Sequence, residues 1–154
     1  MSHFSLAHFA PADIMTSIPA VTDKRLDTGL LILRLAIGAI FIAHGWQKVF
    51  GIGIPGITRG FAQMGVPLAG LVAPLVSVLE LVGGFALVLG LATRIAGLLL
   101  AIDMLGAIVI VHGKNGFFLP KGFEFVMANM TMALTLAIIG AGAYSLDAKL
   151  SRRS

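Results

Sequence analysis

Cysteine is absent from this sequence of 154 residues, and charged side chains are scarce. The absence of cysteine excludes disulfides, thiol nucleophiles and cysteine-ligated metal clusters within the chain. Charged residues make up 12% of the sequence, whereas about a quarter is usual for a soluble domain. The net charge of +4 is spread over chain ends and loops, without a basic stripe of interleaved aromatic residues. The composition therefore does not favour a nucleic acid as a partner.

Apolar residues are correspondingly abundant. They make up 58% of the chain, and the mean hydropathy is +0.99. A soluble domain of this length cannot hide so much apolar surface, because a small domain has too much surface for its volume. A lipid bilayer removes that constraint. The composition therefore predicts a membrane protein with a single domain and the bilayer as its main partner.

Four apolar segments dominate the chain, at about 30–50, 68–91, 95–111 and 124–143. About 20 residues in a helix cross the hydrocarbon core of a bilayer. The turn at 92–94 is so short that the helices on either side of it must be antiparallel neighbours. We therefore expect an all-α fold, an integral membrane antiparallel four-helix bundle.

The predicted four-helix domain comprises residues 27–148. Residues 1–26 are expected to form a loosely ordered cytoplasmic tail, and residues 149–154 a basic cytoplasmic tail. The connection at 51–67 is rich in glycine and proline, and 59–65 within it are expected to form a short interfacial helix. Small residues recur four positions apart in the spans, which lets membrane helices approach closely. These sets are Ala39/Ala43, Ala86/Gly90, Gly97/Ala101 and Ala133/Ala137/Ala141.

The distribution of lysine and arginine predicts the orientation in the membrane. An even number of spans places both termini and the 92–94 turn on the same side. Seven basic residues belong to that side: Lys24, Arg25, Arg34, Arg94, Lys149, Arg152 and Arg153. The other side has Lys48, Arg59, Lys114 and Lys121. The positive-inside rule therefore predicts a multi-pass protein of the inner (plasma) membrane with both termini in the cytoplasm.

Two carboxyl groups interrupt the apolar spans near the middle of the bilayer. At 1.5 Å per residue, Glu80 lies about 16 Å along its helix from Leu91, and Asp103 lies about 13 Å from Arg94. An ionisable group at this depth costs about 2.5–3.5 kcal/mol, so it normally faces the bundle interior and a partner. We expect Glu80 and Asp103 to be catalytic, as acid–base or proton-relay groups. The alternative is structural: neutral carboxyls that hydrogen-bond between helices.

A polar cluster, His44–Lys48, lies at the end of the first span. His44, Gln47 and Lys48 share one helix face, because side chains three and four residues apart are neighbours. We expect this face to line the outer mouth of a pocket between the first three helices. His44 is a third catalytic candidate, at a depth from which it could pair with Glu80, while Trp46, Gln47 and Lys48 are substrate-binding candidates. Alternatively, Lys48 extends to the lipid headgroups and Trp46 belongs to the aromatic belt.

The remaining polar candidates lie near helix ends. His112 and Glu124, at the outer ends of the third and fourth spans, are further substrate-binding candidates, with solvated loop-end side chains as the alternative. Arg34 and Asp147, near the cytoplasmic ends of the first and fourth spans, are expected to form a structural ion pair. No metal site is predicted, because ligands on different helices would have to converge by a coincidence of helix rotation.

Seven short motifs occur in order along the chain. They are 34–38 (RLAIG), 44–48 (HGWQK), 61–67 (FAQMGVP), 80–84 (ELVGG), 90–94 (GLATR), 103–107 (DMLGA) and 140–147 (GAGAYSLD). Together they resemble the DoxX family of small four-helix membrane proteins. The resemblance implies a four-helix integral membrane fold and less about activity. Some members are small subunits of a thiosulfate:quinone oxidoreductase, others are linked to oxidative-stress complexes, and many have no assigned activity.

Three functions fit these observations. The leading hypothesis is a small membrane subunit of a quinone-linked oxidoreductase system, in which the chain binds the quinone and moves protons while a membrane or soluble redox partner supplies electrons. No covalently bound cofactor is expected. The second hypothesis is a non-catalytic assembly or scaffold subunit, in which the buried polar groups are structural. The third is a pathway for small solutes or protons, which would require a homo-oligomer because four helices are few for a transporter.

Overall fold

The computed structural model describes residues 23–151, which form helices joined by short loops, with no strand among them. In chain order, the elements are α2 (Asp23–Trp46), η1 (Gln47–Ile52), α3 (Ile54–Gln63), α4 (Ala69–Leu89), α5 (Thr93–Gly106), η2 (Ala107–His112), η3 (Gly113–Asn115), α6 (Glu124–Ile139) and α7 (Leu146–Ser151). The turns η1 and η2 are π-helical and continue α2 and α5, and η3 is a 3₁₀ turn. The all-α prediction is confirmed.

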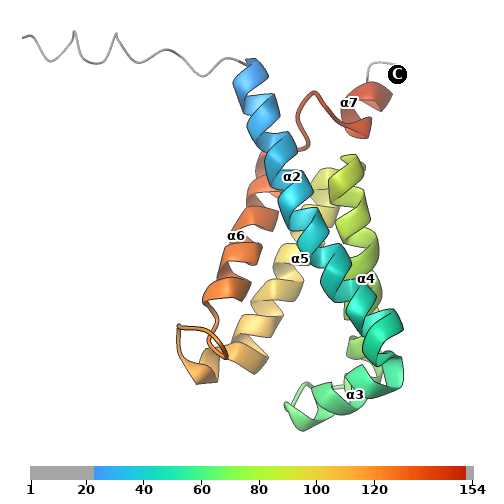
Figure 1. The fold of residues 1–154 in the computed structure, drawn as a ribbon, viewed down its shortest axis with the longest axis vertical. Helices are drawn as coiled ribbons and strands as arrows, with labels where there is room; N and C mark the ends of the chain where they lie inside the picture. The colour runs from blue at the N-terminus through green and yellow to red at the C-terminus, as the bar shows by residue number, and fades with distance from the viewer. Residues whose placement is uncertain (1–22, 152–154) are drawn as a thin grey trace, which may run out of the picture.

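Three continuous helical segments are long and apolar enough to cross a membrane: Asp23–Ile52, Ala69–Leu89 and Thr93–Asn115. The fourth apolar helix, Glu124–Ile139, is shorter, with 16 residues. At 1.5 Å per residue it is about 24 Å long, slightly less than the hydrocarbon thickness of about 30 Å. Successive long helices run in opposite directions (Figure 1). The predicted membrane bundle is therefore present, with a short fourth helix.

Several boundaries differ from the predicted ones. The first helix begins at Asp23, so 23–26, predicted to be loosely ordered, are helical. The other residues of that tail, 1–22, lie outside the described residues, as do 152–154 of the predicted basic tail. The fourth helix ends at Ile139 rather than at 143, because Gly140 and Gly142 adopt φ of +96° and +74°, which a right-handed helix cannot contain. The predicted interfacial helix is α3, which begins earlier, at Ile54.

The bundle consists of two closely packed pairs, α2 with α4 and α5 with α6. At Gly84, an added Cβ atom would lie 2.8 Å from the carbonyl oxygen of Gly38, so this glycine lets α2 and α4 touch backbone to backbone. At Gly97, a Cβ atom would lie 2.7 Å from the carbonyl oxygen of Ala133 across the α5–α6 contact. The prediction that Gly97 lets neighbouring helices approach closely is thus confirmed. Ala39 and Ala43, predicted to face a partner helix, are exposed instead, and Gly38 faces α4.

Both ends of the described chain lie at one end of the bundle. Figure 1 shows the start of α2 and the whole of α7 there, with α3 and the α5–α6 connection at the opposite end. The two helix pairs diverge toward this second end, which is the end that holds the site described below.

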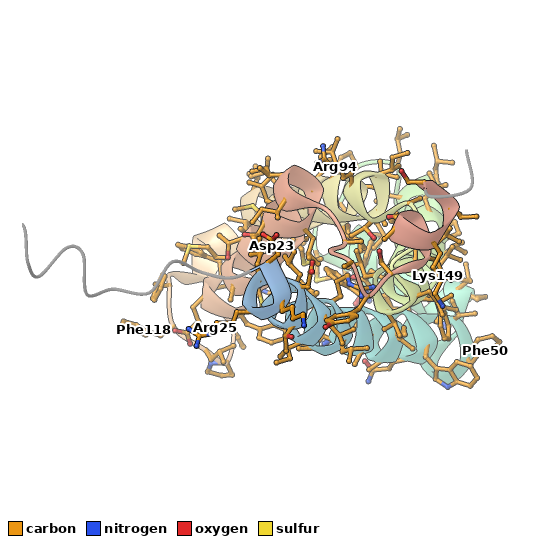
Figure 2. The ribbon with its side chains drawn as sticks, turned by 90° about the horizontal axis from the view of Figure 1, so that it is seen from above. Asp23, Arg25, Phe50, Arg94, Phe118 and Lys149 are labelled. Carbon is orange, nitrogen blue, oxygen red and sulfur yellow. The ribbon has the colours of Figure 1, made fainter. Side chains whose placement is uncertain are left out.

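The outer surface of the bundle is apolar, as a protein in a bilayer requires. Along α4, large apolar side chains are exposed at intervals of three and four residues: Leu71, Leu75, Val78, Val82, Phe85 and Leu89. Figure 2 looks down from the end that carries the termini and shows Phe50 and Phe118 at opposite margins of the molecule, pointing away from it. Lipid chains stabilise such surfaces, whereas water would not.

Arg34 and Asp147, predicted to form an ion pair, bind backbone groups instead. Arg34 is fully buried, and its guanidinium donates to the carbonyl oxygens of Leu87 and Tyr144 at 3.2 and 2.6 Å. Asp147 accepts hydrogen bonds from the backbone N–H groups of Ala92 and Thr93, at 2.7 and 2.9 Å, where α5 begins. No salt bridge joins the two residues within 23–151. The physical reason is that a carboxylate at a helix N-terminus satisfies unpaired N–H groups and interacts favourably with the helix dipole.

Candidate functional site

A cavity of about 520 Å³ lies between the two helix pairs, at the end away from the termini. Its wall is built from α2, η1, α3, α4, α5, η2 and α6, and most of its lining side chains are apolar. The polar residues of the lining are His44, Lys48, Glu80, Asp103, His112 and Asn129. Five of these six were predicted as site residues from the sequence, and the structure brings them to the same cavity. Their catalytic and binding roles stay predictions.

The ammonium group of Lys48 forms a salt bridge with Oε2 of Glu80 inside this cavity. Helical side chains tilt toward the N-terminus of their own helix. Lys48, at the far end of the first helix, therefore extends back into the bundle, while Glu80 on the antiparallel α4 tilts toward the cavity end. The side chains meet, and they are 18% and 4% exposed respectively. Glu80 thus pairs with Lys48 rather than with His44, and Lys48 does not extend to the headgroups.

Gly45 explains how the two helices come close enough for this pair. An added Cβ atom at Gly45 would lie 2.5 Å from the backbone nitrogen of Leu81, next to Glu80. The backbones of α2 and α4 therefore touch one helical turn before Lys48. The π-helical turn η1 then begins at Gln47. A π turn widens a helix locally and changes the direction of its side chains, and such turns are frequent at functional sites.

Asp103 and Asn129 contribute polar atoms that have no hydrogen-bond partner within the described residues. These atoms are Oδ2 of Asp103 on α5 and Oδ1 of Asn129 on α6, and both are buried. Asn129 is 2% exposed, and its amide nitrogen donates to the carbonyl oxygen of Phe125 at 2.9 Å. Buried polar groups are nearly always paired. Two unpaired atoms on the wall of one cavity therefore indicate a place for a ligand or for water.

Asn129 was not among the predicted site residues. The signal that could have identified it is an amide in an otherwise apolar span, which must find hydrogen bonds away from lipid. The burial of an ionisable group costs more free energy than that of an amide, so the carboxyls are the stronger signal in the sequence.

The two histidines occupy the margins of the cavity. His44 is exposed on one side, and its ring lies 6.1 Å from the ring of Phe125 on α6, centroid to centroid. Nδ1 of His112 lies 3.1 Å from the carbonyl oxygen of Lys121, which fixes the ring against the α5–α6 loop. Both imidazoles can therefore contact a ligand at the mouth, but neither pairs with a buried carboxyl in the described part of the chain.

Three predicted binding residues do not line the cavity. Trp46 is exposed and packs against Phe50, with ring centroids 4.4 Å apart, as an aromatic pair at a membrane interface would. Gln47 is exposed on the outer surface. Oε1 of Glu124 accepts a hydrogen bond from the backbone nitrogen of Leu119 at 2.7 Å, so this carboxylate orders the loop before α6. Trp46 thus has the surroundings of its alternative role in the aromatic belt.

The chemistry of the cavity is that of a site for a mostly apolar ligand with a few polar atoms. Ligand sites are typically apolar concavities of about 300–1,000 Å³ with a small number of placed polar groups. Lys48 supplies a donor on the α2–α4 side, and Asp103 and Asn129 supply acceptors on the α5–α6 side. No group of three His, Asp or Glu side chains suited to a metal ion occurs within residues 23–151.

Comparison with known proteins gives a consistent set of relatives. A family model described as DoxX matches residues 29–113. A Bacillus subtilis protein named "Putative oxidoreductase CatD" is 34% identical over 125 residues, covering 81% of this chain and 89% of that protein. The Mycobacterium tuberculosis "Uncharacterized membrane protein Rv3486" is 35% identical over 149 residues, covering 90% and 91%. The Escherichia coli "Inner membrane protein YqjF" is 35% identical over 133 residues, covering 84% and 98%. No solved structure matches the chain.

Proposed function

We propose that this chain, which belongs to the DoxX family of membrane proteins, is a small subunit of a quinone-linked oxidoreductase system in the inner membrane. The observation that carries the proposal is the Lys48–Glu80 salt bridge in the wall of an apolar cavity. The name of the Bacillus subtilis relative supports an oxidoreductase role, and that of the Escherichia coli relative supports the location. The positive-inside rule supports cytoplasmic termini and a cavity that opens at the outer face.

The cavity wall suits a quinone headgroup. The headgroup is a flat, mostly apolar ring with carbonyl oxygens that accept hydrogen bonds. Lys48 carries three N–H donors, of which Glu80 occupies one in the salt bridge, so others remain for a carbonyl oxygen. His44 lines the mouth on the same helix and is a further donor when protonated on the facing nitrogen.

The quinone supplies the two-electron chemistry, because it takes up two electrons and two protons to become the quinol. In this proposal the electrons come from a membrane or soluble redox partner protein. The chain's own residues bind the headgroup and deliver protons. Glu80 holds the ammonium group of Lys48 in place. The carboxyl of Asp103, whose Oδ2 has no other partner in the described chain, delivers the two protons one after the other and takes up a proton from water between the two transfers.

Ligand binding by the purified full chain in lipid nanodiscs tests the proposal. We expect decylubiquinone to bind, and Lys48→Met to weaken this binding about tenfold, because a charged hydrogen bond to the ligand is lost. Lys114→Met is the matched control, since Lys114 is exposed in the α5–α6 connection and does not line the cavity. Absence of binding, or equal binding by both variants, would overturn the proposed site.

A second measurement tests proton delivery. In membranes from cells that express the protein with its native redox partner, Asp103→Asn is expected to slow quinone reduction while leaving decylubiquinone binding within a factor of about three. An amide resembles the carboxyl in shape but cannot release the proton. An unchanged rate in Asp103→Asn would remove Asp103 from the proposed proton path.

A further inference from the structure

The α5–α6 wall of the cavity requires a hydrogen-bond donor from its ligand. Oδ1 of Asn129 is buried and unpaired in the described chain, and an amide oxygen accepts at any pH. The orientation of the amide is fixed, because of its two ends only the nitrogen can donate to the carbonyl oxygen of Phe125. Reversing the amide would place two acceptors against each other.

The neighbouring carboxyl strengthens this requirement. Oδ2 of Asp103 is also buried and unpaired in the described chain, and it lines the same cavity. A carboxyl group has at least one acceptor oxygen in either protonation state. The α5–α6 wall therefore presents the amide oxygen of Asn129 as an acceptor throughout, and the carboxylate of Asp103 as a second acceptor once its proton has been delivered. The α2–α4 wall presents the ammonium donor of Lys48.

A quinone does not satisfy both walls. Its carbonyl oxygens accept hydrogen bonds but cannot donate them, so a bound quinone pairs with Lys48 and leaves the oxygen of Asn129 unpaired. A hydroquinone carries hydroxyl groups, which both donate and accept. It can donate to Asn129 from one end of the ring and accept from Lys48 at the other.

We propose that this cavity binds the reduced hydroquinone in preference to the quinone, and that Asn129 determines the preference. The inference rests on the proposed function and adds the redox state that the site favours. A buried acceptor left unpaired weakens binding, and we expect the hydroquinone to bind about tenfold more tightly. By thermodynamic linkage, such a preference raises the midpoint potential of the bound quinone by about 30 mV for a two-electron couple. The bound quinone thereby becomes a better electron acceptor.

Anaerobic titration calorimetry with decylubiquinone and decylubiquinol, on the full chain in nanodiscs, tests the inference. The wild-type chain should have a Kd about tenfold lower for decylubiquinol. In Asn129→Leu, which conserves side-chain volume, the two Kd values should become nearly equal through a loss of quinol affinity. Thr135→Val is the matched control: Thr135 lies on the same helix, donates to the carbonyl oxygen of Thr131 at 2.8 Å, and does not line the cavity. This control should keep the wild-type ratio.

The outcomes separate this inference from the proposed function. Binding of both forms with equal Kd, or tighter binding of the quinone, overturns the inference and leaves the quinone site in place. A wild-type preference that persists in Asn129→Leu overturns the assignment to Asn129. Binding of neither form overturns both proposals. The wild-type ratio needs no variant, so the inference stays testable even if Asn129→Leu does not fold.

Discussion

Nη2 of Arg34 donates to the carbonyl oxygen of Tyr144 at 2.6 Å, across 110 residues of sequence. Nη1 of the same side chain donates to the carbonyl oxygen of Leu87 at 3.2 Å. One buried guanidinium therefore joins α2, the end of α4 and the segment that follows α6. A planar group with five donors in fixed directions suits this position, whereas a lysine would present a single point of charge.

Replacing Arg34 with leucine should lower the free energy of unfolding by about 2–3 kcal/mol. The substitution leaves the carbonyls of Leu87 and Tyr144 without their charged donor. Reversible unfolding in mixed detergent micelles, followed by circular dichroism, measures the change. Arg94→Leu is the control, because Arg94 is exposed and, within residues 23–151, its only hydrogen bond is to the carbonyl oxygen of Ile139 at 3.5 Å. Its effect should stay within about 0.5 kcal/mol. Equal effects would contradict the role given to Arg34.

Gly84→Ala should destabilise the bundle by about 1–3 kcal/mol. The added methyl group would meet backbone atoms of α2 at 2.8 Å, and backbone cannot move aside as a flexible side chain can. Gly70→Ala on the same helix is the matched control, since a Cβ atom there meets nothing within 4 Å. Thermal unfolding of both variants in detergent makes the comparison. A Gly84 variant as stable as the Gly70 variant would show that the α2–α4 contact is looser than described.

The Lys48–Glu80 pair should show strong coupling in a double-mutant cycle. Lys48→Met leaves a buried carboxylate without its counterion, and we expect a loss of about 3 kcal/mol in unfolding free energy. The combined variant Lys48→Met/Glu80→Gln removes both charges and should recover at least half of that loss. The same mixed-micelle unfolding assay applies. Additive effects of the two single substitutions would indicate that the charges do not interact.

Orientation in the membrane can be tested because the chain has no cysteine of its own. Lys114 in the α5–α6 connection and Lys149 on α7 are both exposed and lie at opposite ends of the bundle. In right-side-out vesicles, a membrane-impermeant maleimide should label Lys114→Cys and should label Lys149→Cys only after permeabilisation. The reverse pattern would place the termini outside and would move the cavity to the cytoplasmic half of the membrane.

The helices could be predicted from the sequence because each span is an apolar run with few charges. Lipid requires such a composition of every segment that crosses it. The sequence also identified Glu80 and Asp103 as residues of the interior, because their burial is costly. The pairing of Glu80 with Lys48 could not be predicted from the sequence. Sequence fixes position along a helix axis, but rotation about that axis and the tilt of a long side chain depend on the neighbouring helix.

The end of the fourth helix illustrates a second limit. The run 140–143 is small and apolar, so it reads as a continuation of the span. The structure instead ends the helix at Gly140, and the chain then turns so that Tyr144 meets Arg34. Glycine permits either conformation. The turn brings the carbonyl of Tyr144 to a guanidinium more than one hundred residues earlier in the chain, a contact that no local pattern could reveal.

The Arg34–Tyr144 contact imposes an order on biosynthesis. A ribosome completes α2 long before it reaches Tyr144, so the first helix enters the bilayer while its guanidinium still lacks its closest acceptor. An arginine in a newly inserted helix is therefore expected to stay near the headgroups, where water can solvate it. Both of its acceptors are in place once α4 and α6 have been inserted and the segment after α6 has folded back. The burial of this guanidinium is thus a late step of assembly, because its closest acceptor follows the fourth helix in the chain.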